Sequence, residues 1–375
     1  MKHFAFIIAS LLVFSGVYAQ TKVKVLNNSN FDRTNEIVEV KASKKTLVYI
    51  KNSFVLTNSE GKEIAYQLTY NSQKQVNGFI FQADVKAKSK SVYLIATGKP
   101  AKVKYLTSAQ FVPERKDDFA WENDIAAYRM YGPALASEKP SNGVDLWLKR
   151  VPDTVVAKRY RDELKNGLTY HVDRGNGLDC YKVAHTLGAG GIAPFQNGKL
   201  FVGDNYNRYV INEIGPLRSV FTLYYDKVKV GNEIVSQEIK ITTVAGSILN
   251  KAEVTYSGNV ANFGVAGGIF THDEKGKKYS KPESGIIAYA EDAVSDAKEN
   301  VGRNYVGVYF PSKASGVISQ DNHLLITAPY KTMSTFTYYF GGGWNKWQFP
   351  TDEDWFNAME KFNLQKRQPL KVCIK

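Results

Sequence analysis

Polar and apolar residues alternate along most of the chain with a period of two. Segments that mix β-branched and aromatic residues with polar ones predict strands, because alternate residues of a strand face opposite sides of a sheet. Turn-forming residues separate these segments at 58–61, 197–198 and 273–276, and at the triple glycine that starts at Gly341. Strands are predicted over 46–56, 78–85, 91–96, 219–225, 233–243, 252–256, 305–310 and 324–326.

Helical periodicity is scarce. The best helix candidates are 288–300 and 351–362, and in the second Thr351 is placed to cap the helix with Asp354 in its first turn. The remaining pattern predicts an all-β fold, mostly antiparallel, with few helices. Its sheets are expected to pack face to face as a large β-sandwich.

The first residues have the pattern of an export signal. Lys2 and His3 give a positive start, residues 4–14 are almost entirely apolar, and Ala19 marks the expected cleavage site. The apolar run is too short to cross a bilayer, which takes roughly 20 residues. We therefore expect 1–19 to be a cleaved signal peptide. The mature protein is expected in the periplasm, with secretion into the medium as the less favoured alternative.

Near residues 99–114, ordinary amphipathic strands give way to a segment dense in titratable and aromatic residues, which predicts a domain boundary. Before it, ordinary amphipathic strands predict a small N-terminal β domain over 20–106. After it, residues 107–375 predict a larger β domain that holds nearly everything of chemical interest. We expect this larger domain to be the catalytic β-sandwich.

Composition and net charge indicate which kind of molecule the protein binds. The chain has 375 residues, of which 43% are apolar, so it can bury a sizeable core, and its formal net charge is +13. Such an excess predicts an anionic partner. The basic residues are scattered, and an exported protein rarely meets nucleic acid. An acidic polysaccharide therefore fits better than nucleic acid, and no membrane partner is expected after signal cleavage.

The two cysteines are Cys180 and Cys373. They could form one disulfide in an oxidising compartment, but two thiols are too few for a disulfide framework or a zinc cluster. Cys180 is either a nucleophile or, as most buried cysteines are, a packed thiol.

The stretch from Pro113 to Leu135 is the first with concentrated chemistry. On a strand, Arg129 and Tyr131 would project from one face. Such a pair could grip a carboxylate and offer a proton donor or acceptor beside it. The alternative is an arginine in a salt bridge and a tyrosine in the core. Glu122 and Asn123 belong to the same stretch and are candidates for substrate binding.

A second stretch with concentrated chemistry runs from Tyr170 to Phe195. Two histidines, His171 and His185, are interleaved here with other titratable or polar side chains. A core strand seldom carries so many such groups, because each buried charge must be paired or lose solvation. We therefore expect these side chains to line a polar cleft. The others singled out are Arg174, Tyr181 and Lys182.

A divalent metal could be bound by His171, His185, Asp173 and Asp179. Histidine and aspartate are suitable ligands, and His272 with Asp273 offers a further pair. No H-E-x-x-H motif is present, so a metal is not favoured and no cofactor is predicted. The chain also lacks a P-loop, a dinucleotide-binding G-x-G-x-x-G and the G-x-S-x-G of serine hydrolases.

Aromatic residues gather near the C-terminus beside the triple glycine. Trp344 and Trp347 could stack on sugar rings from a loop that closes over a cleft, or they could be core residues. The sequence favours neither interpretation.

Four motifs in order resemble a known family. They are WENDIAAYRMYGPAL, GLDCYKVAHTLGAGGIAPF, NEIGPLRSVFTLYY and GGGWNKW, and they extend over most of the mature chain. The resemblance is to a domain-of-unknown-function family of bacterial polysaccharide-degradation loci, which includes ulvan oligosaccharide dehydratases. It implies removal of water from the non-reducing-end uronic acid of a sulfated oligosaccharide, which leaves a 4,5-unsaturated uronate. It also implies a β-sandwich of the galactose-mutarotase-like type.

Such an elimination needs a base for the C5 proton, a cation for the carboxylate and an acid for the leaving hydroxyl. Arg129 or Arg174 could face the carboxylate. The base could be His171 or Tyr131, and the acid His185 or Tyr181. Candidates for binding sulfate or the rest of the substrate are Arg218, Lys182, Glu122, Asn123, His272, Trp344 and Trp347.

Two other functions stay open. A polysaccharide lyase acting by β-elimination shares the C5 chemistry but expels a sugar instead of water. A non-catalytic carbohydrate-binding protein would use the aromatic residues, although the clustered titratable residues argue against it. An open groove favours the lyase, and a closed pocket the dehydratase.

Overall fold

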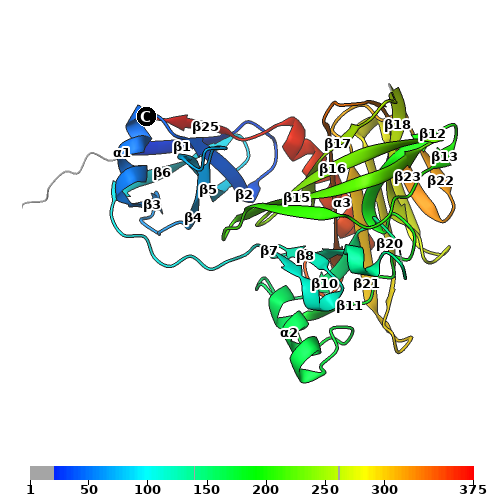
Figure 1. Cartoon of the computed structure of the whole chain (residues 1–375). Helices are drawn as coiled ribbons and strands as arrows, with labels where there is room; N and C mark the ends of the chain where they lie inside the picture. The colour runs from blue at the N-terminus through cyan, green and yellow to red at the C-terminus, as the bar shows by residue number, and fades with distance from the viewer. Residues whose placement is uncertain (1–20, 139, 261) are drawn as a thin grey trace, which may run out of the picture.

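The computed structural model describes residues 21–138, 140–260 and 262–375. The predicted signal peptide, residues 1–19, lies outside the described residues. The described residues form five sheets and three α-helices (Figure 1). The helices are α1 (Lys44–Asn52), α2 (Val156–Asn166) and α3 (Asp352–Arg367).

The largest sheet has eight strands, and every neighbouring pair is antiparallel. The sequence folds this way because alternate positions are apolar: in Glu233–Val244 nearly every second residue is buried. In spatial order the strands are β14 (Arg208–Glu213), β15 (Arg218–Val230), β16 (Glu233–Val244), β17 (Asn250–Ser257), β24 (Phe336–Trp344), β21 (Asn300–Tyr309), β20 (Ile286–Val294) and β19 (Lys277–Lys281).

Two five-stranded sheets form the second layer of the sandwich. They meet at a parallel bridge between Val144 and Gly188. The first contains β11 (Gly177–Asp179), β10 (Asp145–Lys149), β9 (Ala127–Met130), β8 (Asp118–Glu122) and β7 (Ser108–Val112). The second contains β13 (Lys199–Leu200), β12 (Ala189–Gln196), β18 (Asn262–Phe270), β23 (His323–Lys331) and β22 (Gly316–Gln320).

Aromatic side chains fill the space between the layers. Trp121 of β8 packs on Phe221 of β15 with ring centroids 5.0 Å apart. The Tyr338 hydroxyl of β24 donates to the Gly190 carbonyl of β12 at 3.2 Å. A Cβ at Gly190 would lie 2.6 Å from the Phe340 side chain, so the close approach of the two layers requires glycine there.

Helix α3 covers the outer face of β20 and β21. Its Trp355 stacks on Tyr305, and its Met359 sulfur occupies the space that a Cβ of Gly307 would take. Thr351 caps the helix by accepting from the Asp354 backbone, while the Asp354 carboxylate accepts from Thr351. Thr351 is the cap that the sequence predicted, and its reciprocal bonds with Asp354 form a capping box.

The N-terminal residues form two small sheets with a core of their own. Val25, Phe79 and Tyr93 are among the buried residues of that core. The C-terminal strand β25 returns to pair with β1, so both ends of the described chain lie in this part (Figure 1). One sheet is β25 (Lys371–Ile374), β1 (Thr21–Asn27), β6 (Ser89–Thr97) and β3 (Phe54–Asn58), and the other is β2 (Arg33–Lys41), β5 (Val76–Val85) and β4 (Tyr66–Tyr70).

The predicted fold class is confirmed: the protein is mostly antiparallel β, with sheets packed as a sandwich and few helices. No helix in the described part of the chain is long and apolar enough to cross a membrane.

Three local predictions are wrong. Residues 46–56 form most of α1 and part of β3 instead of one strand, because Ser43 and Thr46 build a capping box that starts a helix. Residues 288–300 form most of β20 and the turn to β21 instead of a helix. Ile286–Glu291 is buried on both faces, so the alternation of a strand is lost. The triple glycine at Gly341 lies inside β24 and is not a loop.

Candidate functional site

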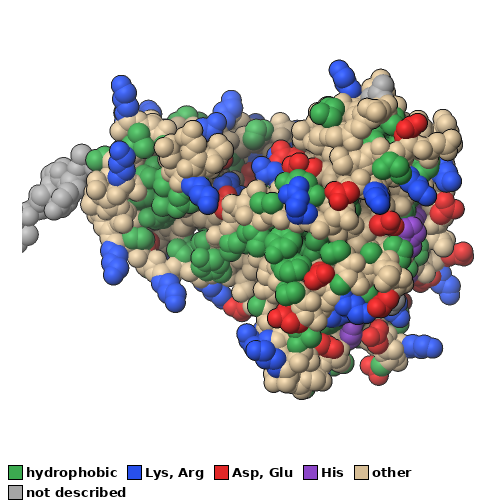
Figure 2. Space-filling model, viewed as in Figure 1, with side chains coloured by type: hydrophobic (Ala, Val, Ile, Leu, Met, Phe, Trp, Pro, Cys, Tyr) green, Lys and Arg blue, Asp and Glu red, His purple; other side chains and the backbone are tan. Residues whose placement is uncertain are grey.

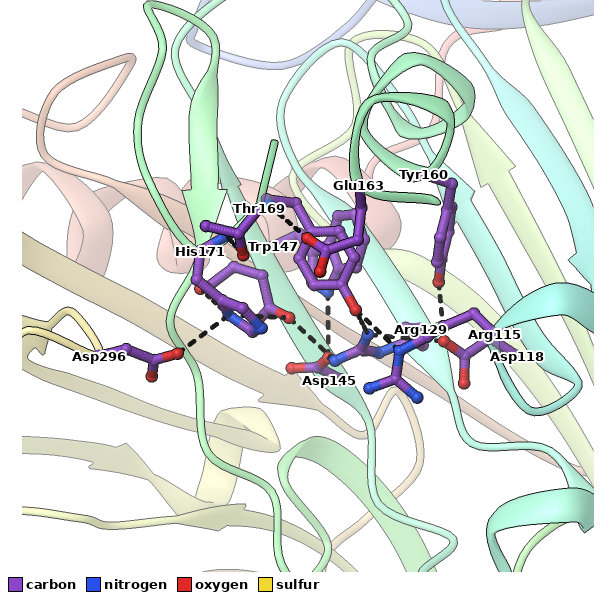
Figure 3. Close-up of polar contacts among 12 residues, drawn as sticks. Arg115, Asp118, Arg129, Asp145, Trp147, Tyr160, Glu163, Thr169, His171 and Asp296 are labelled. Atoms are coloured by element: carbon purple, nitrogen blue, oxygen red, sulfur yellow. Dashed lines mark hydrogen bonds and ion pairs between the residues drawn. The ribbon is translucent and has the colours of Figure 1, made fainter. Parts of the chain in front are cut away.

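A buried arginine surrounded by carboxylates lies on one face of the sheet β7–β11 (Figure 3). Arg129 of β9 donates to Asp145 of β10 through Nε at 2.8 Å and to Asp179 of β11 through Nη2 at 2.9 Å. Asp118 of β8 lies 3.5 Å from Nη1. The arginine and the three aspartates are at most 4% exposed, and we call them the Arg129 cluster. The strand register places them together: Asp145 is paired with Arg129, and Asp179 with the neighbouring Trp147.

Aromatic side chains enclose the guanidinium of Arg129. Its Cζ lies 5.0 Å from the Trp147 ring centroid and 5.1 Å from that of Tyr131. The Tyr170 hydroxyl accepts from Arg129 at 3.2 Å and from Arg115 at 3.0 Å. These contacts exclude water from the cation and leave the aspartates as its charge partners.

Burial changes the proton affinity of these carboxyl groups. It raises the pKa of Asp118 to about 6, although Arg129 and Arg115 oppose the shift. Burial, and then the charge of Asp145, raise the pKa of Asp179 well above its usual range. One buried oxygen each of Asp118 and Asp145 has no hydrogen-bond partner among the described residues. Burying the charged groups of the Arg129 cluster away from water costs free energy. Such buried titratable groups with shifted pKa values are common at functional sites.

His171 lies at the solvent side of this cluster, in the segment between α2 and β11. Its Nδ1 is 2.9 Å from the Asp179 carbonyl oxygen. A carbonyl can only accept, so Nδ1 carries the hydrogen and Nε2 has the lone pair. No hydrogen bond to Nε2 is found from residues 21–138, 140–260 or 262–375. The side chain is 32% exposed, so a substrate can reach the ring from solvent.

Two carboxylates lie beside the His171 ring. The nearer oxygens of Asp179 and Asp296 are each 3.7 Å from Nδ1, one from inside the protein and one from its surface. Asp296 follows β20 and is 57% exposed (Figure 3). The negative charge of the exposed Asp296 would stabilise an imidazolium formed when Nε2 accepts a proton.

The Arg174 side chain is hydrogen-bonded to the backbone near His171. The guanidinium of Arg174 donates to the carbonyls of Thr169 and Val172, on either side of Tyr170 and His171. Its side chain is exposed. Figure 2 shows basic, acidic and histidine side chains mixed over the region of α2 and β11. His171, Asp296 and Arg174 form the accessible part of the site.

Arg129, a candidate from the sequence for binding the substrate carboxylate, is buried among aspartates. It is 4% exposed and its donors are committed to aspartates, so a substrate carboxylate could reach it only by opening the core. Tyr131 does share its face, as the alternation predicts. Burial raises the pKa of Tyr131 beyond the normal range, however, so its phenol does not ionise to act as a base.

Four more predicted residues are core residues. The Tyr181 hydroxyl donates to the Phe270 carbonyl at 3.1 Å, and Trp344 is 1% exposed. Glu122 accepts from buried Lys149 at 2.8 Å and from two backbone amides at the start of α2. The Asn123 side chain bonds to backbone groups of two loops. The contacts of each of these side chains lie within the protein.

His272 joins two loops. Its Nδ1 is 2.6 Å from the Glu291 carboxylate and its Nε2 is 2.6 Å from the Lys182 carbonyl, so both ring nitrogens donate and the ring is a cation. Burial alone would lower the pKa of His272, but the hydrogen bond and the charge of Glu291 raise it. The contact fixes the backbone of the 179–188 segment, whereas the Lys182 side chain is exposed.

The remaining predicted residues lie apart from this site or at its margin. His185 is exposed and its Nδ1 bonds to the Pro140 carbonyl at 2.6 Å, with no ion pair among the described residues. Arg218 starts β15 and pairs with Glu213 at 2.9 Å. Trp347 is half-buried and donates to the Asp124 carbonyl at 3.3 Å.

The cysteines and the metal-binding residues can also be placed. Cys180 and Cys373 are free thiols. Burial raises the pKa of Cys180, so this thiol stays protonated and is not a nucleophile. Within residues 21–138, 140–260 and 262–375, no three His, Cys, Asp or Glu side chains converge to hold a metal ion.

The protein belongs to the DUF4861 family, described as a domain of unknown function, whose sequence model matches residues 25–372. The match includes both the N-terminal sheets and the sandwich. The chain is also 30% identical over 278 residues to "Uncharacterized protein P7" of Formosa agariphila, which covers 71% of this chain and 69% of that protein.

Solved structures with a similar fold come from Enterococcus faecalis. One is titled an α-mannosidase (TM-score 0.50) and another a protein of glycosyl hydrolase family 38 (TM-score 0.51). Each is 10% identical and covers 95% of this chain. The chain spans 46% and 47% of their lengths, so it corresponds to only part of each. At this identity the likeness concerns the fold alone.

Proposed function

We propose that the protein is an oligosaccharide dehydratase. It removes water from the non-reducing-end uronic acid of ulvan-type sulfated oligosaccharides and leaves a 4,5-unsaturated uronate. Support comes from the family membership together with the motifs noted in the sequence, and from a fold that occurs in proteins titled as carbohydrate-active enzymes. The observation that carries the proposal is His171, with a fixed tautomer, a ring that a substrate can reach from solvent and the exposed Asp296 carboxylate 3.7 Å from Nδ1.

In the proposed reaction Nε2 of His171 takes the C5 proton of the uronate. The electrons of the C5–H bond form the C4–C5 double bond, and the C4–O bond breaks. Asp296 stabilises the imidazolium, and Arg174 neutralises the substrate carboxylate as negative charge develops beside it. The sequence offered either Arg129 or Arg174 for binding the carboxylate, and Arg174 is the exposed one of the two.

The same imidazolium then returns the proton to the departing C4 hydroxyl, which leaves as water. In a glucuronate residue the C5 hydrogen and the C4 oxygen lie on the same face of the ring, so one side chain can serve as base and acid. In iduronate they lie on opposite faces. We therefore propose glucuronate as the preferred residue. The step requires no cofactor, and the periplasm stays the predicted place of action.

The test uses purified protein and sulfated oligosaccharides that end in a saturated glucuronate. Loss of one water by mass spectrometry, with a new ultraviolet absorbance, is the expected result for the wild type. His171→Gln should lower the rate by about 100-fold or more, because acid–base groups contribute factors of that size. His185→Gln is the matched control, since it removes an exposed histidine that makes no ion pair with the described residues, and it should keep the wild-type rate.

Other outcomes would overturn the proposal. Scission of internal linkages would identify a polysaccharide lyase, and binding without any turnover would identify a carbohydrate-binding protein. Equal rates for His171→Gln and the wild type would show that the site is elsewhere. Equal rates on glucuronate and iduronate ends would contradict the single-residue mechanism.

A further inference from the structure

A polar cleft lies away from His171, between the N-terminal sheets and the edge of the eight-stranded sheet. Its volume is about 720 Å³, within the roughly 300–1,000 Å³ typical of small-ligand sites. The hairpin after β4 forms one wall, and β14 to β16 form the other. It shares no residue with the Arg129 cluster or with His171, Arg174 and Asp296. We call it the β4–β15 cleft.

The lining of this cleft has an excess of two positive charges. Lys74, Arg218 and Lys240 are its cations, and Glu213 is its only acidic residue. Glu213 is already paired with Arg218 at 2.9 Å. Lys74 and Lys240 are exposed and make no ion pair with any residue that the structure describes. The cleft therefore favours an anion.

The walls of the cleft are held rigidly. Gln67 of β4 accepts from the backbone amides of Leu217 and Arg218 at 2.8 and 2.9 Å and donates to the Arg218 carbonyl at 3.0 Å. These bonds join the N-terminal sheets to β15. The hairpin that carries Lys74 is closed by Asn71, whose side chain accepts from the Gln75 amide at 2.9 Å. A site held in this way loses little entropy when a ligand binds.

Apolar surface accompanies the charges. Tyr70 is 51% exposed at the end of β4, and Val210 and Ile211 of β14 are 37% and 42% exposed. Figure 2 shows hydrophobic side chains gathered between the N-terminal sheets and β15. Sugar rings present apolar C–H faces to such surfaces, and the Asn71 and Asn212 side chains in the lining can bond to hydroxyls.

We propose that the β4–β15 cleft is a second carbohydrate site, which binds a sulfated segment of an oligosaccharide away from the reacting uronate. The choice of a sulfated sugar rests on the proposed function. Lys74, Lys240 and Arg218 bind sulfate groups, and Tyr70 with the β14 residues contacts the rings. Arg218 thereby keeps the sulfate-binding role expected from the sequence, but at a site separate from His171.

The test compares two charge-matched double variants by isothermal titration calorimetry at low salt. Lys74→Ala/Lys240→Ala removes cations of the cleft. Lys41→Ala/Lys229→Ala removes two exposed lysines outside it, one from the N-terminal sheets and one from β15. A sulfated uronate oligosaccharide should bind the cleft variant about tenfold more weakly than the wild type, as expected for two partly exposed charge pairs. The control variant should bind like the wild type.

Three results would overturn the site: equal affinities of the two double variants, equal affinities of wild type for sulfated and desulfated sugar, or full competition by an equal concentration of inorganic sulfate. Tyr70→Ala adds an independent measurement, because it should weaken binding without changing charge. Dehydration of a short substrate is measured in parallel, and the cleft variant should keep the wild-type rate. Failure of the proposed function would instead appear as no water loss by the wild type, whatever the binding data show.

Discussion

At the scale of single residues, burial decides what Arg129 and His171 can do. Both belong to segments dense in titratable groups, yet Arg129 is 4% exposed and the His171 side chain 32%. Arg129 therefore orders the carboxylates, and His171 faces solvent above them. The role of Arg129 is to hold Asp179, whose carbonyl fixes the tautomer of His171.

We expect Arg129→Ala to destabilise the fold as well as to lower activity. Removing the cation leaves Asp118, Asp145 and Asp179 buried without compensation, which costs about 3–5 kcal/mol. Urea unfolding followed by fluorescence measures this change. Arg150→Ala is the control, because its ion pair with Asp173 is on the surface and should contribute less than about 1 kcal/mol. Similar stabilities of the two variants would contradict the importance of the cluster.

The pKa of Asp118 predicts a pH dependence of stability. It is about 6 in the folded protein, against about 3.9 when unfolded, so between these values the folded state binds more protons. The free energy of unfolding should therefore fall as pH rises from about 4 to 6, by about 2–3 kcal/mol from this group, and then level off. Asp118→Asn should flatten this part of the profile, measured by urea unfolding at a series of pH values. Asp226→Asn, an exposed aspartate, should leave it unchanged.

At the scale of elements, β24 shows why a glycine run is not always a loop. Gly341, Gly342 and Gly343 are at its end, and a Cβ on any of them would come within 3 Å of neighbouring atoms. Close packing around this part of the strand therefore requires glycine. The sequence pattern is the same for a flexible loop and for a strand under close packing.

We expect Gly342→Ala to destabilise the protein by at least about 2 kcal/mol. The new Cβ would lie 2.4 Å from the Tyr305 carbonyl and 2.6 Å from the Leu146 side chain, and the backbone atom cannot move away. Gly316→Ala is the control within an edge strand, since nothing lies within 4 Å of its Cβ. Thermal unfolding of the two variants compares them directly, and equal melting temperatures would refute this account.

Secondary-structure prediction from the sequence fails where a strand is buried on both faces, because the alternation of polar and apolar residues is then lost. Strands with one solvent-facing side, such as β16, could be predicted because alternate residues are polar. β20 could not, since it is buried from Ile286 to Glu291 and its alanines are good helix formers. Asp296 was missed as a site residue for the same reason: it lies in the segment expected to be helical.

At the scale of the whole molecule, the C-terminal strand returns to the N-terminal sheets. β25 pairs with β1 from Val23 to Leu26, and Arg33 donates to the Gln368 carbonyl at 2.7 Å. Gln67 adds a second connection, at β15. The two parts of the protein are therefore joined by both backbone and side-chain hydrogen bonds.

Removing residues 370–375 should loosen the N-terminal sheets selectively. β1 would become an edge strand, and amides such as that of Lys22, which donates to the Lys375 carbonyl, would lose their partner. Hydrogen exchange followed by mass spectrometry should show faster exchange in β1, with β16 and β21 unchanged. Cys373→Ser keeps the strand and serves as the control. Unchanged exchange in β1 would show that β25 does not protect it.

The sequence by itself determined the fold class, the capped helix α3 and the segments that carry the candidate chemistry, because alternation, capping and clustering of titratable residues are local patterns. Only the tertiary structure decided which of these residues face solvent. Arg129, Glu122 and Trp344 are core residues, while His171 and Arg174 are accessible. The physical reason is that burial and charge pairing depend on strands far apart in the sequence, such as the pairing of Asp145 with Arg129 and the approach of Asp296 to His171.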